Sequence, residues 1–253
     1  MKPLNKIALI TTTAIVGFSL ISFTQTELTT NKSAKATTEK KAIPDTEIRN
    51  VSGFTGIKSS NGIDVFISQG TTERVEVKAD AETMKHLRTE VKNGVLEIYM
   101  ESNWNGLFSG KSHTTEVHVT AKTLNSLTAS SGSDVKTLTK IKADKFSAKA
   151  SSGSDLTLNI EVNEFSFESS SGSDATITGS AKVAHLKSSS GSDIEANKLM
   201  TEVCEAQASS GSNISVSVSK QLKAVASSGG DISYHGNPSV SKEESSGGEV
   251  SKD

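Results

Sequence analysis

An acidic side chain recurs along the second half of the chain at a nearly constant spacing. It stands two residues after the glycine of a Ser-Ser-Gly triplet, and seven such triplets follow one another at intervals of 18 to 21 residues. Carboxylates are hard oxygen ligands of the kind that calcium prefers, and glycine-rich acidic repeats can bind it. The candidate calcium ligands are Asp134, Asp155, Asp174, Asp193 and Asp231, and the row also includes Asn213 and Glu249.

The alternative for this Asp column is structural. An Asp side chain in a turn can accept hydrogen bonds from nearby backbone N–H groups. Calcium requires six to eight oxygen ligands, whereas each turn supplies one acidic group. Carboxylates aligned at about 4.8 Å would repel by roughly 1 kcal/mol per pair in water, which backbone donors could offset. We therefore expect the turn role, and we predict no metal site and no cofactor.

Catalysis by the same residues is the weaker interpretation. Because each Asp repeats regularly, no single position is distinguished as an acid or a base. The histidines are scattered without the spacing of metal ligands, and the many serines have no identifiable base. We predict no catalytic residue, with a glycan-active β-helix enzyme as the alternative. The histidines are His86, His113, His118, His185 and His235.

The residues that flank each triplet alternate between apolar and polar types. Such a period of two indicates strands with one buried face. The apolar position three residues after the glycine holds Val135, Leu156, Ala175, Ile194, Ile214, Ile232 and Val250, and the structural turn glycines are Gly132, Gly153, Gly172, Gly191, Gly211 and Gly229, with Gly247 in the last copy.

One strand–turn–strand unit of about 19 residues cannot bury its apolar face alone, whereas stacked units can. We therefore predict an all-β fold, a right-handed parallel β-helix, or β-solenoid, with about nine rungs of 18–21 residues. Apolar residues between the turns suggest a third strand in each rung. They are Ile141, Val162, Val183, Leu199 and Val218.

The amino-terminal part of the domain is less regular. Arg74 to Lys78 alternates as a strand, Ala79 to Leu87 suits one short helix, and Val91 to Ile98 reads as a hairpin around an Asn-Gly turn. The loop that follows contains Trp104 and Phe108, and aromatic side chains in a loop can mark a contact site. The alternative is a loop that folds over the solenoid and covers its core.

The first residues resemble an export signal, with Lys2 and Lys6 before a mostly apolar stretch. We assign 1–36 to the signal peptide and cleavage region, 37–47 to a linker, 48–240 to the solenoid and 241–253 to a charged cap or tail. An uncleaved anchor is the alternative to cleavage. Removing 1–36 takes away four lysines and one glutamate, which leaves 23 basic and 28 acidic residues. That balance argues against a nucleic-acid partner. The single cysteine, Cys204, stands at an apolar position of the repeat, so we expect it to be buried.

Several segments together resemble the DUF2807 family, the "putative auto-transporter adhesin, head GIN domain". They are Gly53-Phe54-Thr55-Gly56-Ile57, Gly62-Ile63-Asp64-Val65, Gln69-Gly70, Asn93-Gly94-Val95-Leu96 and the repeated Ser-Gly-Ser-Asp turns, within Ile48 to Tyr234. The resemblance implies a right-handed parallel β-helix and an envelope location, commonly in Bacteroidetes. It implies no catalytic residue.

These observations favour an exported, non-catalytic protein, either an adhesin-like binding module or a structural one. We expect it in the periplasm, on the outer-membrane surface or outside the cell, with no integral membrane domain once the signal is cleaved. Cell-surface or envelope components are the expected partners. A glycan-active enzyme and a calcium-binding repeat protein are the alternatives.

Overall fold

The computed structural model describes residues 45–102, 104 and 115–253. About 70% of this part is β-strand, and its single short helix accounts for 3%. The elements are β1 (Asp45–Arg49), β2 (Gly56–Ser59), β3 (Asp64–Gln69), β4 (Arg74–Ala79), α1 (Ala81–His86), β5 (Leu87–Lys92), β6 (Val95–Met100), β7 (Glu116–Ala121), β8 (Ser126–Ala129), β9 (Asp134–Thr137), β10 (Ile141–Ser151), β11 (Asp155–Ser170), β12 (Asp174–Ser189), β13 (Asp193–Ser209), β14 (Asn213–Ser227), β15 (Asp231–His235), β16 (Ser239–Ser245) and β17 (Glu249–Lys252).

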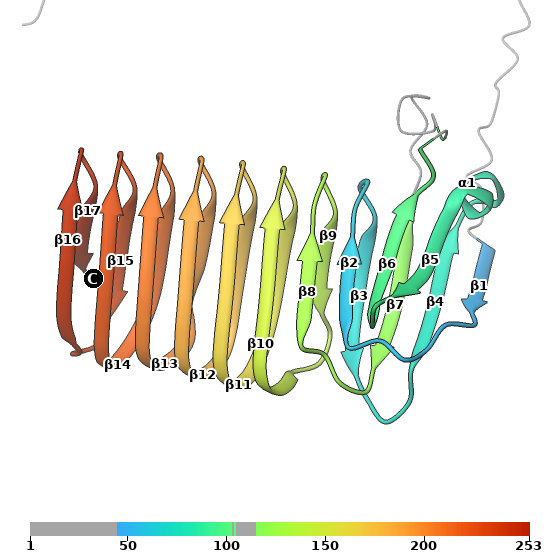
Figure 1. Ribbon diagram of the computed structural model, residues 1–253, viewed down its shortest axis with the longest axis horizontal. Coiled ribbons are helices and arrows are strands. Elements are labelled where there is room, and N and C mark those ends of the chain that lie inside the picture. Colours follow the sequence, from blue (N-terminus) through green and yellow to red (C-terminus); the bar gives the residue numbers. More distant parts are fainter. Residues whose placement is uncertain (1–44, 103, 105–114) are drawn as a thin grey trace, which may run out of the picture. The chain divides into compact units, whose positions relative to one another are not determined.

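The regular part of the fold is a parallel coil in which each rung lies on the one before it. Strand β11 pairs with β12 in parallel, with Asp155 beside Asp174 at one end and Ser170 beside Ser189 at the other. The near strands rise to the Ser-Ser-Gly turns and the far strands descend as the chain advances to the left, so the coil is right-handed (Figure 1). The predicted fold class is confirmed.

The consecutive coil has about seven turns, fewer than the nine expected. The cause is the path of the amino-terminal part. Strand β2 pairs with β6 on one side and with β8 on the other, and β3 lies likewise between β7 and β9. The β2–β3 rung and the β8–β9 rung are therefore neighbours in space. The segment from β4 to β7 separates them in the sequence, but it lies on the far side of the β2–β3 rung.

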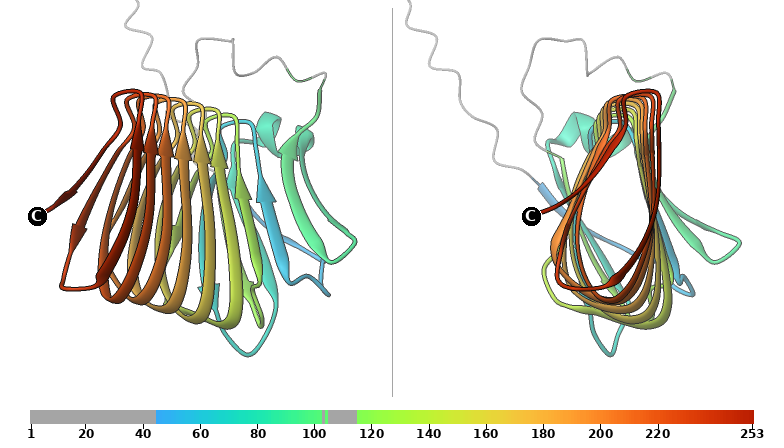
Figure 2. Two further views of the ribbon diagram at one scale, coloured as in Figure 1. Left: turned by 60° about the vertical axis from the view of Figure 1, so that its left-hand side comes forward. Right: turned by 90° about the vertical axis from the view of Figure 1, so that its left-hand side faces the viewer.

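Each rung has two faces and no separate third strand. The long strands β11 to β14 run unbroken from one turn to the next and bend midway, as the view along the coil shows (Figure 2). Of the five inward positions expected between the turns, Ile141, Val162, Leu199 and Val218 are buried, and only Val183 differs. Val183 is half-buried beside Glu164, whereas Ala181 occupies the buried position beside Val162. The expectation of a third strand was wrong because the chain turns the corner without leaving the ladder.

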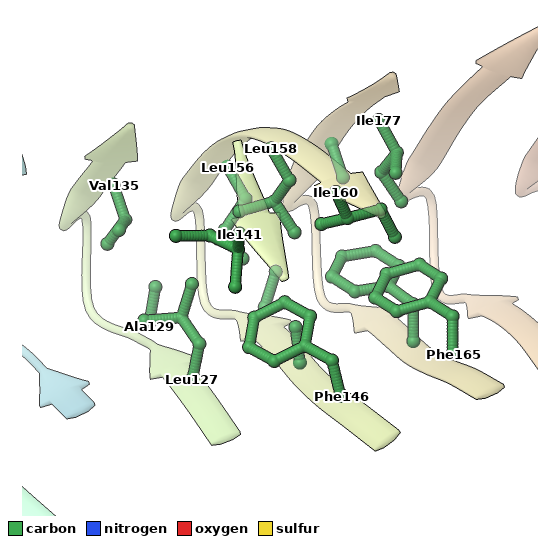
Figure 3. Packing of buried hydrophobic residues seen from close by; sticks show 14 of the residues in the cluster. Leu127, Ala129, Val135, Ile141, Phe146, Leu156, Leu158, Ile160, Phe165 and Ile177 are labelled. Carbon is green, nitrogen blue, oxygen red and sulfur yellow. The ribbon is translucent and has the colours of Figure 1, made fainter. Parts of the chain in front are cut away.

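The core is one continuous column of inward side chains (Figure 3). Phe146 lies on Phe165 with ring centroids 5.9 Å apart, and Phe165 lies 6.1 Å from Phe167 in the same strand. Across the coil, Val135, Leu156 and their equivalents face these rings. Because neighbouring rungs stand in register, each apolar side chain packs on its counterparts above and below.

The amino-terminal elements agree with the sequence prediction where they are described. The strand β4, the helix α1 and the β5–β6 hairpin all form, and the hairpin turn has positive φ at Asn93 and Gly94. The predicted signal peptide and most of the linker lie outside the described residues. In the part that is described, no helix has the length and apolar character needed to cross a bilayer.

Two glycines provide a matched test of the coil. A Cβ at Gly179 would lie 2.0 Å from the Ile160 carbonyl oxygen of the preceding rung, at φ +110°, whereas one at Gly172, at φ +65°, would meet nothing within 4 Å. We expect Gly172→Ala to cost about 1–2 kcal/mol, the penalty of the left-handed conformation alone. Gly179→Ala should cost more, because the backbone of β11 must also move. Chemical denaturation of both variants checks this, and equal losses would contradict the register described here.

Candidate functional site

The repeated turns are tight because two consecutive residues adopt positive φ. In the third copy Ser171 has φ 59° and Gly172 has φ 65°, and a Ser and a Gly with positive φ recur in every copy. Two consecutive positive φ values are the pattern of a type I′ turn, which here joins the two faces of the coil. The Gly172 N–H donates to the Ser190 carbonyl of the next turn at 3.1 Å, so the ladder continues across the turns themselves.

A buried serine, not the aspartate, closes four of the turns through its hydroxyl. The Ser173 hydroxyl accepts from the Ser170 N–H at 3.1 Å and lies 2.8 Å from the Ser170 carbonyl oxygen, to which it donates. The turn role predicted for the Asp column therefore belongs mainly to its neighbour. The signal was present in the repeat, because the same residue type follows the glycine in five copies: Ser133, Ser154, Ser173, Ser192 and Ser212, all fully buried.

The Asp column is longer in space than in the sequence repeat. Register pairs Asp64 with Glu116 and places Asp64 next to Asp134, because Val65 lies beside Val135. We call the whole row the acidic ladder. In spatial order it contains Glu116, Asp64, Asp134, Asp155, Asp174, Asp193, Asn213, Asp231 and Glu249. Asp64 stands two residues after Gly62, as in the later copies, whereas Glu116 could not be found from the repeat because no Ser-Ser-Gly triplet precedes it.

Contacts within the acidic ladder join one rung to the next. The Asp193 N–H donates to Asp174 Oδ1 at 3.3 Å, and Asn213 Nδ2 donates to Asp193 Oδ1 at 2.8 Å. Burial, followed by the charge of Asp155, raises the pKa of Asp134 above its ordinary value. Burial, followed by the charges of Asp134 and Glu116, raises the pKa of Asp64 in the same way. Ionising these two carboxyls therefore opposes folding.

No three His, Cys, Asp or Glu side chains of the described residues are grouped in a way that could hold a metal ion. The five candidate calcium ligands, Asp134, Asp155, Asp174, Asp193 and Asp231, stand in a single line along the coil. A line of carboxylates, one for each rung, does not surround an ion as a calcium site does.

The two faces of the coil differ in charge pattern. We call the face formed by residues before each turn the approach face and the face formed by residues after it the exit face, which carries the acidic ladder. On the approach face charges pair across rungs, with Lys149 2.7 Å from Glu168 and Lys223 2.9 Å from Glu205. The acidic ladder contains no base anywhere between Glu116 and Glu249. The exit face therefore presents a row of carboxylates that is not neutralised within the row.

The predicted contact loop is placed only in part. Trp104 is half-buried and packs against the core cluster, which is the position expected of a side chain that covers apolar residues. Phe108 lies outside the described residues. Cys204 is buried as expected, and burial raises its pKa to about 12, so the thiol remains protonated at neutral pH.

The bend opposite the turns carries a shallow groove of about 550 Å³ that sequence reasoning did not find. A register irregularity in β13 produces one of its side walls. There Leu199 points into the core while Met200, next to it, is 65% exposed. Bulges often re-aim a side chain in this way. Glu161, Lys182 and Glu202 supply the charged part of the lining.

Comparison with known proteins places the fold in a family. A model of DUF2807, described as "Putative auto-transporter adhesin, head GIN domain", matches residues 53–238. The chain belongs to the DUF2807 family. The match covers both the inserted amino-terminal strands and the regular rungs, so the DUF2807 domain includes both. A search of curated proteins finds no match.

Solved structures share the DUF2807 fold at low identity. A "putative adhesin" from Bacteroides fragilis is 18% identical with a TM-score of 0.71, and the alignment covers 83% of this chain and 95% of that one. A "putative lipid binding protein" from Parabacteroides distasonis is 19% identical with a TM-score of 0.68, covering 84% and 98%. A "putative adhesin" from Parabacteroides merdae is 17% identical with a TM-score of 0.67, covering 84% and 97%. Likeness at this level concerns the fold.

Asp134→Asn tests the electrostatics of the acidic ladder in this DUF2807 domain. A raised pKa in the folded state means that the carboxyl stabilises the fold below its ordinary pKa of 3.8 and loses that contribution as pH rises. Asn keeps an acceptor without the charge, so the variant should be more stable than wild type at pH 7, by about 0.2–1 kcal/mol. The gain should shrink with added salt and vanish in acid. Asp231→Asn, beside the uncharged Asn213, is the control and should gain less. Loss of stability at pH 7 in Asp134→Asn would contradict the repulsion.

Proposed function

We propose that this protein is an exported, non-catalytic binding module of adhesin type that acts at the cell envelope or cell surface. The observation that supports this most is the acidic ladder on the exit face. Eight carboxylates and one carboxamide stand in one row along the coil, one on each strand of the exit face. A row of like groups at a fixed spacing suits a partner that is itself extended or repetitive, because many weak contacts add when they are held together.

The difference in charge between the two faces indicates which face binds the partner. Charges on the approach face are largely compensated by cross-rung Lys–Glu pairs. In one of them, Lys223 bonds to Glu205 and lowers the pKa of that carboxyl. Such pairing leaves little net charge on this face. The exit face lacks that compensation within its ladder. We therefore assign binding to the exit face and structural stabilisation to the approach face. Envelope or surface components that carry positive charge are the expected partners.

The family supports an adhesin-like role and an exported location. Burial raises the pKa of two carboxyls of the acidic ladder, Asp64 and Asp134, but no His, Lys or Arg stands in the row as a partner acid or base, which is why we assign the ladder to binding and not to catalysis. The alternatives predicted from the sequence, a glycan-active enzyme and a calcium-binding repeat protein, have distinct readouts in the experiments below.

The binding test uses purified protein and isolated cell envelopes in a co-sedimentation assay. Replacing Asp155, Asp174 and Asp193 by Asn should reduce the bound fraction severalfold, with a larger difference at low salt. The matched control replaces Glu164, Glu168 and Glu205 of the approach face by Gln, which removes the same number of charges and should leave binding near wild type. Trp104→Ala, at a half-buried position, should lower the melting temperature and leave binding intact while the protein is folded.

Three outcomes would count against this assignment. Equal losses in the two triple variants would show that the exit face is not the binding face. Loss of binding in folded Trp104→Ala would move the contact site to that loop. Release of soluble oligosaccharides from purified glycans, abolished by one Asp→Asn change, would replace the binding module by an enzyme. Fractionation of a host that expresses the full chain tests the location.

Calcium should have little effect on the melting temperature. An ion that binds only the folded protein would stabilise it by about 2.7 kcal/mol at a hundredfold excess over Kd. We expect a shift near zero, because one carboxylate per turn supplies too few oxygens. A rise of several degrees that chelator reverses, and that is lost when Asp155 and Asp174 become Asn, would favour the calcium-binding alternative.

A further inference from the structure

The last rung carries charges at positions that are apolar or small in the rungs before it. Strand β16 pairs with β14 so that Lys242 lies beside Ala224 and Glu244 beside Ala226. Both alanines are buried in the core. The two charged side chains therefore belong to the inward columns of the coil, at the point where no further described strand covers them.

Backbone direction in β17 shows which groups face the free edge. The Glu249 N–H donates to the Gly230 carbonyl at 3.2 Å, and the Asp253 N–H donates to the Tyr234 carbonyl at 3.1 Å. These residues point back toward β15. Since residues in a parallel strand alternate in direction, the N–H and C=O of Val250 point away from the coil, where the next strand of the ladder would bind.

Lys242 and Glu244 hydrogen-bond to those two backbone groups. Glu244 Oε1 accepts from the Val250 N–H at 2.7 Å, and Lys242 Nζ donates to the Val250 carbonyl oxygen at 3.2 Å. The two side chains also pair with each other at 2.9 Å between Nζ and Oε1. The ion pair thus spans the open end of the core from β16 to β17 and satisfies the outward N–H and C=O of Val250 with side chains of the same rung.

We propose that this pair, the Lys242–Glu244 plug, is an autoinhibitory contact that keeps the carboxyl-terminal edge from pairing with a second copy of the chain. An unprotected edge strand is a template for another strand, and inward-pointing charge is one of the ways in which native sheets block it. A second copy is the occupant that fits, because the edge continues the ladder and the half-buried Val240 and buried Val250 extend its inward columns. At the other end the outermost strands are β1 and β5, which pair antiparallel with β4 and β6 and so present an edge of a different geometry.

The test converts the last rung into an internal one. Lys242→Ala with Glu244→Ala reproduces the residues of the preceding rung, and light scattering after size exclusion should then give a mass of at least a dimer that rises with concentration. Wild type should remain monomeric. The control, Lys223→Ala with Glu205→Ala, removes an exposed pair of the same geometry, 2.9 Å apart, away from the edge and should also remain monomeric.

A rescue identifies the edge that is used. Adding Val250→Pro to the double alanine variant removes the edge N–H, and proline is tolerated where that group faces solvent, so the mass should return to that of a monomer. Lys242→Met is a milder variant that keeps the volume of the side chain, and it should associate more weakly than the double variant. Circular dichroism accompanies each measurement.

Several results would overturn the proposal. The double variant could fold and stay monomeric, or melt earlier without associating. Its association could also persist when Val250→Pro is added. Finally, wild type itself could self-associate and become monomeric only with Val250→Pro. None of them bears on the binding face, because the acidic ladder is unchanged in all these variants.

Discussion

The parallel register between rungs is the constraint on which the rest of the structure depends. Each rung is only two short faces and a turn, and it has no core of its own, so its apolar side chains are buried only when the rungs on both sides present matching positions. The pairing of Phe146 with Phe165 shows how strict this is, because the rings stack only if the two strands are in register to the residue. A slip by one residue would turn every inward side chain outward.

The turn follows from the same constraint. A connection that keeps two faces in register for rung after rung must be short, and here it is a two-residue turn with positive φ at both positions. Serine is a costly residue for the left-handed conformation. It is held there because the glycine after it bonds to the next turn and the buried serine after that closes its own turn. The first rung solves the same problem with Asn61 and Gly62, the residue pair most suited to this turn.

Periodicity in the sequence was sufficient to predict the fold class and the inward columns, because in a solenoid the contacts between rungs follow directly from the repeat. It was not sufficient for features that depend on a break in the repeat. The insertion from β4 to β7 could not be placed, since antiparallel pairing of β4 with β7 requires the chain to pass outside a rung it has already formed. Glu116 was missed for the same reason. Met200 was missed because it becomes exposed at a register irregularity at the bend, and no local pattern distinguishes it from its buried neighbour Leu199.

A fold that grows by adding equivalent rungs must also be stopped at both ends. The regular spacing that aligns the acidic ladder for a repetitive partner also leaves a row of unpaired backbone groups at each end of the coil. At the amino-terminal end the chain reverses direction, so that the outermost strands, β1 and β5, pair antiparallel with β4 and β6. At the carboxyl-terminal end the solution is local, and two side chains replace the missing strand at Val250. The difference follows from how the coil is made: the insertion at one end changes the direction of the backbone, whereas the other end keeps the rung geometry and only charge at inward positions can make the next rung unfavourable.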